Sequence, residues 1–207
     1  MTLTAVLLTG GESRRMVRDK ATIEFEGQPL WKRQLEILRV LGPEKILVSA
    51  RATPSWLPDD VELLLDDPPS RGPLSGLTKA LAAMGTSHLI VVAVDMPFMT
   101  GEELGRISGL AQTGYGVVPM IHDRAEPLAA VYPAEASPDF AEALAGADFS
   151  LQRLVRRLAA EDIIRFLPVP ARDEHLYRSV NEPDDFKEGR FPNRPPKDIG
   201  GLETAAP

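Results

Sequence analysis

The sequence predicts an α/β fold, a mostly parallel sheet with helices on both of its faces. Short apolar runs alternate along the chain with segments whose apolar residues recur at helical spacing. The apolar runs contain few polar residues, which is typical of strands buried on both faces of a sheet. The length of 207 residues and the apolar fraction of 43% are sufficient for one domain with an ordinary core.

The first half of the chain supplies four of these strands and three helices. Buried strands are expected at residues 3–8, 45–50, 61–65 and 88–94, and the last is the most apolar. Helices are expected between them at 30–42 and 73–85, because apolar residues recur every three or four positions and a glycine follows. Thr100 with Glu103 three residues later resembles a capping box, which predicts a third helix beginning there.

The second half is less regular. Strands are expected at 116–120 and 127–132, as a possible pair, and at 162–168, with helices around 140–144 and 150–158. Residues 190–207 are rich in proline and glycine and contain few apolar side chains. We therefore expect residues 1–189 to form one domain and residues 190–207 to form a C-terminal tail.

Composition excludes several functions. The net charge of −7 and the sequence pI near 5.1 argue against nucleic-acid or anionic-membrane binding, which needs an extended basic face. The absence of cysteine excludes disulfides, zinc–thiolate sites and thiol chemistry. The first residues lack the pattern of a signal peptide or a membrane span, so a cytoplasmic location is expected.

One basic stretch stands out against this acidic background. Residues 7–21 read LLTGGESRRMVRDKA, so Gly10 and Gly11 directly follow the first strand. Glycines at the carboxyl end of a strand let backbone N–H groups converge on an anion, and Arg14, Arg15 and Lys20 add positive charge for a polyphosphate. The alternative is an ordinary turn with a solvated basic face. The P-loop and dinucleotide-binding glycine patterns are both absent.

Carboxylates follow two other strands. Asp66 and Asp67 come after the third strand, and Asp95 comes after the fourth. Because parallel strands end at one edge of a sheet, these side chains should lie near Gly10 and Gly11. Mg²⁺ prefers one or two carboxylates together with substrate phosphates. The three segments together favour a nucleotide–Mg²⁺ site, whereas Asp95 alone would be read equally well as a turn residue.

These segments resemble the signature motifs of the molybdenum cofactor guanylyltransferase family. The resemblance begins with LLTGGESRRMVRDKA, where related cytidylyltransferases and sugar nucleotidyltransferases have Pro-Lys in place of Asp19-Lys20. It continues in order through DDPPSRGPLSGL, VDMPF, EPLAAVY and SVNEPDDF, and covers residues 3–186.

The resemblance implies a Rossmann-like nucleotidyltransferase fold. It also implies GTP, molybdopterin and Mg²⁺ as ligands, and transfer of GMP to the molybdopterin phosphate with release of pyrophosphate. Transient contact with proteins that handle molybdopterin is a further expectation, and no oligomeric state is predicted.

The resemblance also implies a role for individual residues. Lys20, Arg15 and Asp95 would be catalytic, with Asp95 holding Mg²⁺ and Lys20 and Arg15 neutralising the phosphates. The remaining residues would bind the nucleotide or the acceptor. For the nucleotide they are Leu8, Thr9, Gly10, Gly11 and Asp67, with Asp66 one position away from Asp67, and for the acceptor they are Ser179 and Asn181.

Two positions depart from the family pattern. Val17 stands where the family has glycine, and a β-branched residue strongly disfavours positive φ. Ser179 stands where the family has asparagine. Three alternatives therefore stay open: cytidylyl transfer to molybdopterin, nucleotidyl transfer to another phosphorylated acceptor, and nucleotide binding without turnover.

Overall fold

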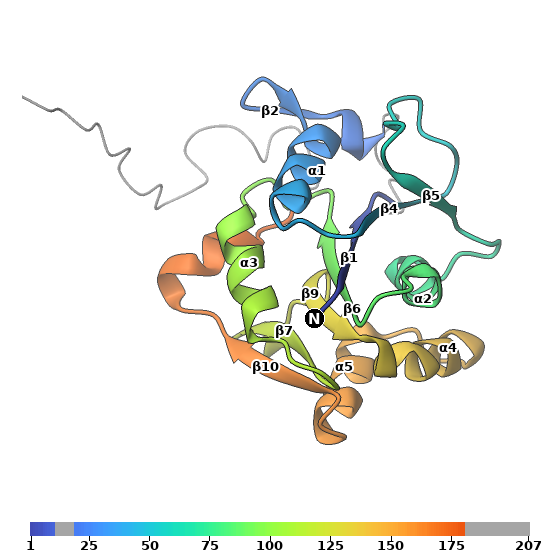
Figure 1. Ribbon diagram of the computed structural model, residues 1–207, viewed down its shortest axis with the longest axis vertical. Coiled ribbons are helices and arrows are strands. Elements are labelled where there is room, and N and C mark those ends of the chain that lie inside the picture. The colour runs from blue at the N-terminus through green and yellow to red at the C-terminus, as the bar shows by residue number, and fades with distance from the viewer. Residues whose placement is uncertain (11–18, 181–207) are drawn as a thin grey trace, which may run out of the picture.

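The computed structural model describes residues 1–10 and 19–180, and it confirms the predicted α/β fold (Figure 1). Within these residues an eight-stranded sheet has the order β10-β7-β9-β6-β1-β4-β5, with β8 added beside β7. β1 pairs in parallel with β4 and β6, β4 with β5, and β7 with β10. β9 runs antiparallel to both of its neighbours, so the sheet is mostly parallel.

The elements follow the predicted order. The strands of this sheet are β1 (Leu3–Leu8), β4 (Lys45–Ala50), β5 (Glu62–Leu65), β6 (His88–Ala93), β7 (Gly116–Ile121), β8 (Arg124–Ala125), β9 (Ala129–Pro133) and β10 (Ile164–Pro168). A small hairpin is formed by β2 (Glu24–Phe25) and β3 (Gln28–Pro29). The helices are α1 (Leu30–Val40), α2 (Pro73–Ala83), α3 (Gly101–Leu110), α4 (Ser137–Ala145) and α5 (Leu151–Ala160). Three short 3₁₀ helices are η1 (Lys20–Thr22), η2 (Ala134–Ala136) and η3 (Ala171–Tyr177).

Helices cover both faces of the sheet, as predicted (Figure 1). Successive residues of a strand point to opposite faces, so Ala5 and Leu7 of β1 belong to one buried cluster, and Val6 and Leu8 belong to the other. The first cluster is completed by α1 and α3, and the second by α2, α4 and α5. Strands apolar at every position are therefore explained by burial on both sides.

Two helices also end where the sequence predicts, just before a glycine. Gly42 and Gly85 have φ of 62° and 68°, the left-handed conformation that glycine adopts most easily after a helix. The predicted pairing of the strands near residues 116 and 131 is confirmed, since Val117 of β7 lies opposite Val131 of β9.

Two local expectations are corrected. The third strand is not buried on both faces: β5 is the edge strand of the sheet, and Leu65 at its end is 43% exposed. Thr100 caps α3, because its hydroxyl accepts a hydrogen bond from the Glu103 N–H at 3.2 Å. The Glu103 carboxylate, however, turns to Arg106 and Tyr177 instead of returning to the helix start. The reciprocal half of the capping box is therefore replaced by a pair within α3 and by one tertiary contact.

The predicted tail at 190–207 lies outside the described residues, as do residues 181–189. Among the residues that are described, no helix has the length and apolar character needed to cross a membrane.

Candidate active site

The carboxyl edge of the sheet gathers the segments that the sequence singles out. β1, β4, β5 and β6 are parallel neighbours, so Gly10, Ala50, Asp66 and Asp95 all come at or just after the same ends of their strands. Backbone hydrogen bonds beyond the strands hold this edge together, since Asp66 N donates to Ala50 O at 2.9 Å and Val94 N donates to Leu8 O at 3.0 Å. Ligands of open α/β sheets bind at this edge.

Lys20 and Asp95 form the charged centre of the edge. Lys20 Nζ lies 3.6 Å from Asp95 Oδ2, and the two side chains are only 16% and 24% exposed. Burial raises the pKa of the Asp95 carboxyl, and the charge and hydrogen bond of Lys20 oppose this rise. A half-buried carboxylate whose charge is only partly compensated is a favourable ligand for a cation, because a bound cation stabilises its ionised form.

The turn that carries Asp95 is held from two directions. From α1, Gln34 donates to Met96 O at 2.6 Å and Arg33 donates to Pro97 O at 2.7 Å. From the C-terminal side, Val180 N donates to Asp95 O at 2.8 Å. These bonds occupy successive carbonyls of one turn, so the carboxylate of Asp95 is presented from a fixed backbone.

Gly10 faces Asp66 across the edge. A β-carbon added at Gly10 would lie 3.6 Å from Asp66 Oδ2, so Asp66 is the carboxylate nearest to the end of β1. Ser70 Oγ donates to Asp66 Oδ2 at 2.9 Å, and Ser49 Oγ lies 3.4 Å from Oδ1. Hydroxyls of Ser49 and Ser70 thus orient the Asp66 carboxylate, which lies near Gly10.

Asp67 points away from this centre. Its side chain is 82% exposed, and it pairs with Lys79 of α2 at 2.8 Å. Of the two adjacent aspartates, the structure therefore brings Asp66, and not Asp67, near Gly10. The sequence could not distinguish them, since alternation along a strand does not continue through the turn that follows it.

Backbone polar groups of Leu8 and Thr9 already form hydrogen bonds within the protein. Leu8 O accepts from Val94, and Thr9 donates from both its N–H and its hydroxyl to Ser49 O, each at 2.9 Å.

η1 presents Lys20, and Asp19 organises this short helix. Asp19 Oδ1 accepts from Ala21 N at 3.0 Å, which caps η1, while Trp56 Nε1 donates to Asp19 Oδ2 at 3.0 Å. The Trp56 ring is in turn stacked on Trp31 of α1, with ring centroids 5.0 Å apart and planes 11° apart. The loop after β4 is therefore tied to the segment that carries the lysine.

The two glycines of the GPLSG segment, Gly72 and Gly76, are needed for different physical reasons. Gly72 precedes α2 with φ of 66° and ψ of −143°, a conformation that other residues rarely adopt, and Pro73 follows at the first helical position. Gly76 lets α2 approach β4, because an added β-carbon there would come within 2.4 Å of Ser49 Oγ. Both glycines place the amino end of α2 close to the edge that carries Asp66.

Of the remaining predicted site residues, one lies near the Asp95 turn and the others are outside the described residues. Ser179 is exposed and lies next to Val180, which is bonded to the Asp95 turn, so it is brought to the same region as the Lys20–Asp95 pair. Gly11, Arg15 and Asn181 lie outside the described residues, as does Val17.

The described residues suit a divalent cation that shares its ligands with a substrate. They contain no group of three or more His, Asp or Glu side chains that could hold a metal by themselves. Asp95 supplies one partly buried carboxylate, and Mg²⁺ sites built from one or two carboxylates are completed by substrate phosphates and water. The donor set fits such a metal.

A mostly parallel sheet with a glycine after its first strand and a lysine–carboxylate pair at its carboxyl edge is typical of the class of α/β nucleotide-binding proteins. Comparison with known proteins narrows the class: residues 5–163 match the MobA-like NTP transferase domain. The chain therefore belongs to the family of MobA-like NTP transferases, whose members generally use a divalent metal.

Individual relatives agree with this assignment. A probable molybdenum cofactor guanylyltransferase of Opitutus terrae is 35% identical over 186 residues, covering 88% of this chain and 92% of the relative. A probable molybdenum cofactor guanylyltransferase of Natronomonas pharaonis is 32% identical, covering 90% and 96%. Among solved structures, molybdopterin-guanine dinucleotide biosynthesis protein A of Archaeoglobus fulgidus has a TM-score of 0.67 at 23% identity, covering 88% of this chain and 94% of that one.

Sequence reasoning missed several residues of the site. Ser49 and Trp56 are the main examples, and each forms hydrogen bonds to a segment distant in sequence. The available signals were a polar residue inside the apolar run KILVSA and one of only two tryptophans lying in a proline-containing loop.

Proposed function

We propose that the protein transfers GMP from GTP to the phosphate of molybdopterin and releases pyrophosphate. The observation that carries the proposal is the Lys20–Asp95 pair, 3.6 Å apart and largely buried at the carboxyl edge of the sheet. Membership of the MobA-like NTP transferase family and relatives named molybdenum cofactor guanylyltransferase support the identity of the substrates.

The reaction needs positioning and charge neutralisation more than a reactive side chain. An oxygen of the molybdopterin phosphate attacks the α-phosphorus of GTP, a new P–O bond forms, and the bond to the bridging oxygen of pyrophosphate breaks. Negative charge grows on the leaving pyrophosphate, and we assign its neutralisation to Lys20 and Arg15. Asp95 would hold Mg²⁺, which would supply positive charge to offset the negative charge of the GTP phosphates.

We assign the two substrates to different residues along the carboxyl edge of the sheet. We assign guanine and ribose to the backbone of Leu8, Thr9, Gly10 and Gly11, and a further nucleotide contact to the Asp66–Asp67 turn. The contacts favour Asp66 for this role, because its carboxylate faces Gly10 whereas Asp67 pairs with Lys79. We assign the acceptor to Ser179, which lies next to the Val180–Asp95 hydrogen bond, and to Asn181. GTP is a dissolved metabolite, so we place the reaction in the cytoplasm.

The test is pyrophosphate release with molybdopterin, Mg²⁺ and each of GTP, CTP, ATP and UTP in turn. We expect release with GTP and little with the other three. A preference for CTP would replace guanylyl by cytidylyl transfer, and release only with a different phosphorylated acceptor would replace molybdopterin. Nucleotide binding without release under any of these conditions would identify a non-catalytic relative and overturn the proposal.

A further inference from the structure

The C-terminal part of the described chain is anchored at two buried points beside the active site. Tyr177, at the end of η3, and Val180 are buried, whereas Arg178 and Ser179 between them are exposed. Val180 N donates to Asp95 O at 2.8 Å. A segment of two exposed residues is therefore held across the turn that carries the proposed metal ligand.

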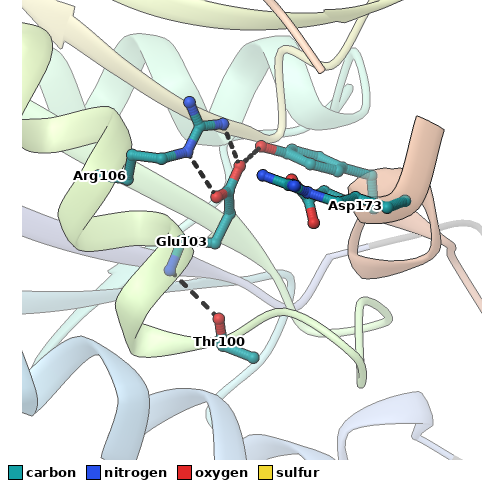
Figure 2. Close-up of polar contacts among 6 residues, drawn as sticks. Thr100, Glu103, Arg106 and Asp173 are labelled. Atoms are coloured by element: carbon teal, nitrogen blue, oxygen red, sulfur yellow. Dashed lines mark hydrogen bonds and ion pairs between the residues drawn. The ribbon is translucent and has the colours of Figure 1, made fainter. Parts of the chain in front are cut away.

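The second anchor is a hydrogen bond between Tyr177 and α3. The Tyr177 hydroxyl donates to Oε1 of Glu103, a carboxylate that is itself only 6% exposed. Arg106 completes the cluster by donating from Nε to Oε2 at 2.7 Å and from Nη2 to Oε1 at 2.6 Å (Figure 2). Figure 2 also shows Thr100 at the start of the same helix, where its hydroxyl caps the Glu103 N–H.

The charges of this cluster are compensated without the tyrosine. Burial by itself would raise the pKa of the Glu103 carboxyl, but hydrogen bonds from Arg106 and Tyr177 and the Arg106 charge outweigh it and lower that pKa. Glu103 is therefore ionised, and its charge is balanced by Arg106. Loss of the Tyr177 hydroxyl would leave this ion pair intact, so the folded core of α3 does not depend on it.

The Tyr177 hydroxyl contributes to the position of the C-terminal segment, and the charge balance of the cluster does not depend on it. α3 begins shortly after the Asp95 turn, so Glu103 and Asp95 belong to one continuous segment that the C-terminal chain contacts twice. Ser179 lies between the two contacts. Fixing one end through Tyr177 and the other through Val180 restricts where Ser179 can stand relative to Asp95.

We propose that Tyr177 and Glu103 are positioning residues that hold the Ser179 segment against the Asp95 turn and thereby set the affinity for the phosphorylated acceptor. This inference rests on the proposed function, because it takes Ser179 as part of the acceptor site. Neither residue touches the substrates: both act through the backbone of residues 178–180.

The experiment compares the wild type with Tyr177→Phe, which removes one hydroxyl and keeps the ring. With molybdopterin, GTP and Mg²⁺, we expect the KM for molybdopterin to rise roughly tenfold, because the lost bond is made to a charged group. The KM for GTP and the kcat at saturating molybdopterin should stay within about twofold of the wild type, since the altered contact lies away from phosphates and base.

The matched control is Thr4→Val. Thr4 is fully buried, and its hydroxyl donates to Met84 O and accepts from Thr86 Oγ1, each at 2.9 Å, but it stands at the start of β1, at the opposite end of the strand from the site. The Thr4→Val substitution therefore also removes the hydrogen bonds of a buried hydroxyl. It should leave the KM for molybdopterin and the KM for GTP unchanged, because Thr4 lies away from the site. Equal KM changes in the two variants, or an unchanged molybdopterin KM in Tyr177→Phe, would overturn the inference.

A second variant keeps the test decisive if Tyr177→Phe does not fold. Glu103→Gln retains an oxygen that can accept from Tyr177, so the molybdopterin KM should rise less than in Glu103→Ala, in which no acceptor is left. Equal molybdopterin KM values in these two variants would overturn the inference. Failure of the proposed function is separate, because it would appear as absence of pyrophosphate release in the wild type itself.

Discussion

Two carboxylate-bearing turns lie at the same edge of the sheet and differ in almost every physical respect. The Asp95 turn follows a central strand, is bonded to α1 and to the C-terminal segment, and pairs its carboxylate with Lys20. The Asp66–Asp67 turn follows the edge strand β5, and Asp67 is 82% exposed. The difference separates a rigid, half-buried position suited to a metal from an open position suited to part of a nucleotide.

Burial explains why the two turns suit different ligands. A cation held by Asp95, as we propose, would act in surroundings of low dielectric, where its attraction to phosphate oxygens would be strong. At the Asp66–Asp67 turn, solvent screens the charge, and hydroxyls of Ser49 and Ser70 orient Asp66. Strong charge effects are therefore expected at the first turn and modest hydrogen-bond effects at the second.

The largest effect is expected for Asp95→Asn. The amide is close to the carboxylate in size but carries no charge for a metal, so turnover should fall by at least about a hundredfold. Thermal unfolding should change little, because the substitution also removes the cost of burying a charge. Steady-state kinetics over a Mg²⁺ titration, with a melting curve for each protein, measure both. Turnover close to that of the wild type at saturating Mg²⁺ would remove Asp95 from the metal site.

Lys20→Ala should have the next largest effect. A charge-assisted contact is worth about 1.5–3 kcal/mol, so the affinity for GTP should fall roughly ten- to a hundredfold. Preference for GTP over ATP should survive, since the backbone assigned to the base is unchanged. Calorimetric titration of both nucleotides into wild type and variant measures this. Loss of affinity together with loss of selectivity would mean that Lys20 organises the whole loop.

The pH dependence of metal binding should reflect the environment of Asp95. Burial raises the pKa of this carboxyl and Lys20 opposes the rise, so the carboxyl takes up a proton at a higher pH than an ordinary aspartate. Protons compete with the metal, and as pH falls through this pKa, metal affinity and kcat/KM should fall.

In Lys20→Gln the opposing charge is absent, so the pKa of Asp95 should rise further and the acid limb of kcat/KM should move to higher pH. Measurement of kcat/KM as a function of pH, at a fixed Mg²⁺ concentration, tests the direction of this shift. Asp67→Asn serves as the control, because Asp67 lies away from this pair and should leave the limb in place. A limb that moves to lower pH in Lys20→Gln would contradict the charge assignment.

The smallest effects are expected at the second turn, where the two neighbouring aspartates provide their own control. Asp66→Asn should weaken GTP binding several-fold, at about 1 kcal/mol, because Asp66 faces Gly10. Asp67→Asn should change it by less than about twofold, since only an exposed pair with Lys79 is lost. Titration of GTP into both variants compares them directly. The reverse order would assign the nucleotide contact to Asp67, as the family pattern implied.

The amino-acid sequence alone determined the class of fold and the location of the site. Fully apolar runs require burial on both faces, and parallel strands end at one edge, so the segments containing Gly10 and Asp95 had to meet. These properties depend on local patterns and general topology, and that is why they could be predicted without coordinates.

Only the tertiary structure decided which side chains face one another at that edge. It turned Asp66 toward Gly10 and Asp67 toward Lys79, and it directed Glu103 to Tyr177, which is 74 positions away in sequence, instead of to its own helix end. Side-chain direction in a turn and contacts between distant segments depend on how the elements pack. Neither has a local signal, because the free energy that selects them comes from burial and charge compensation in the assembled fold.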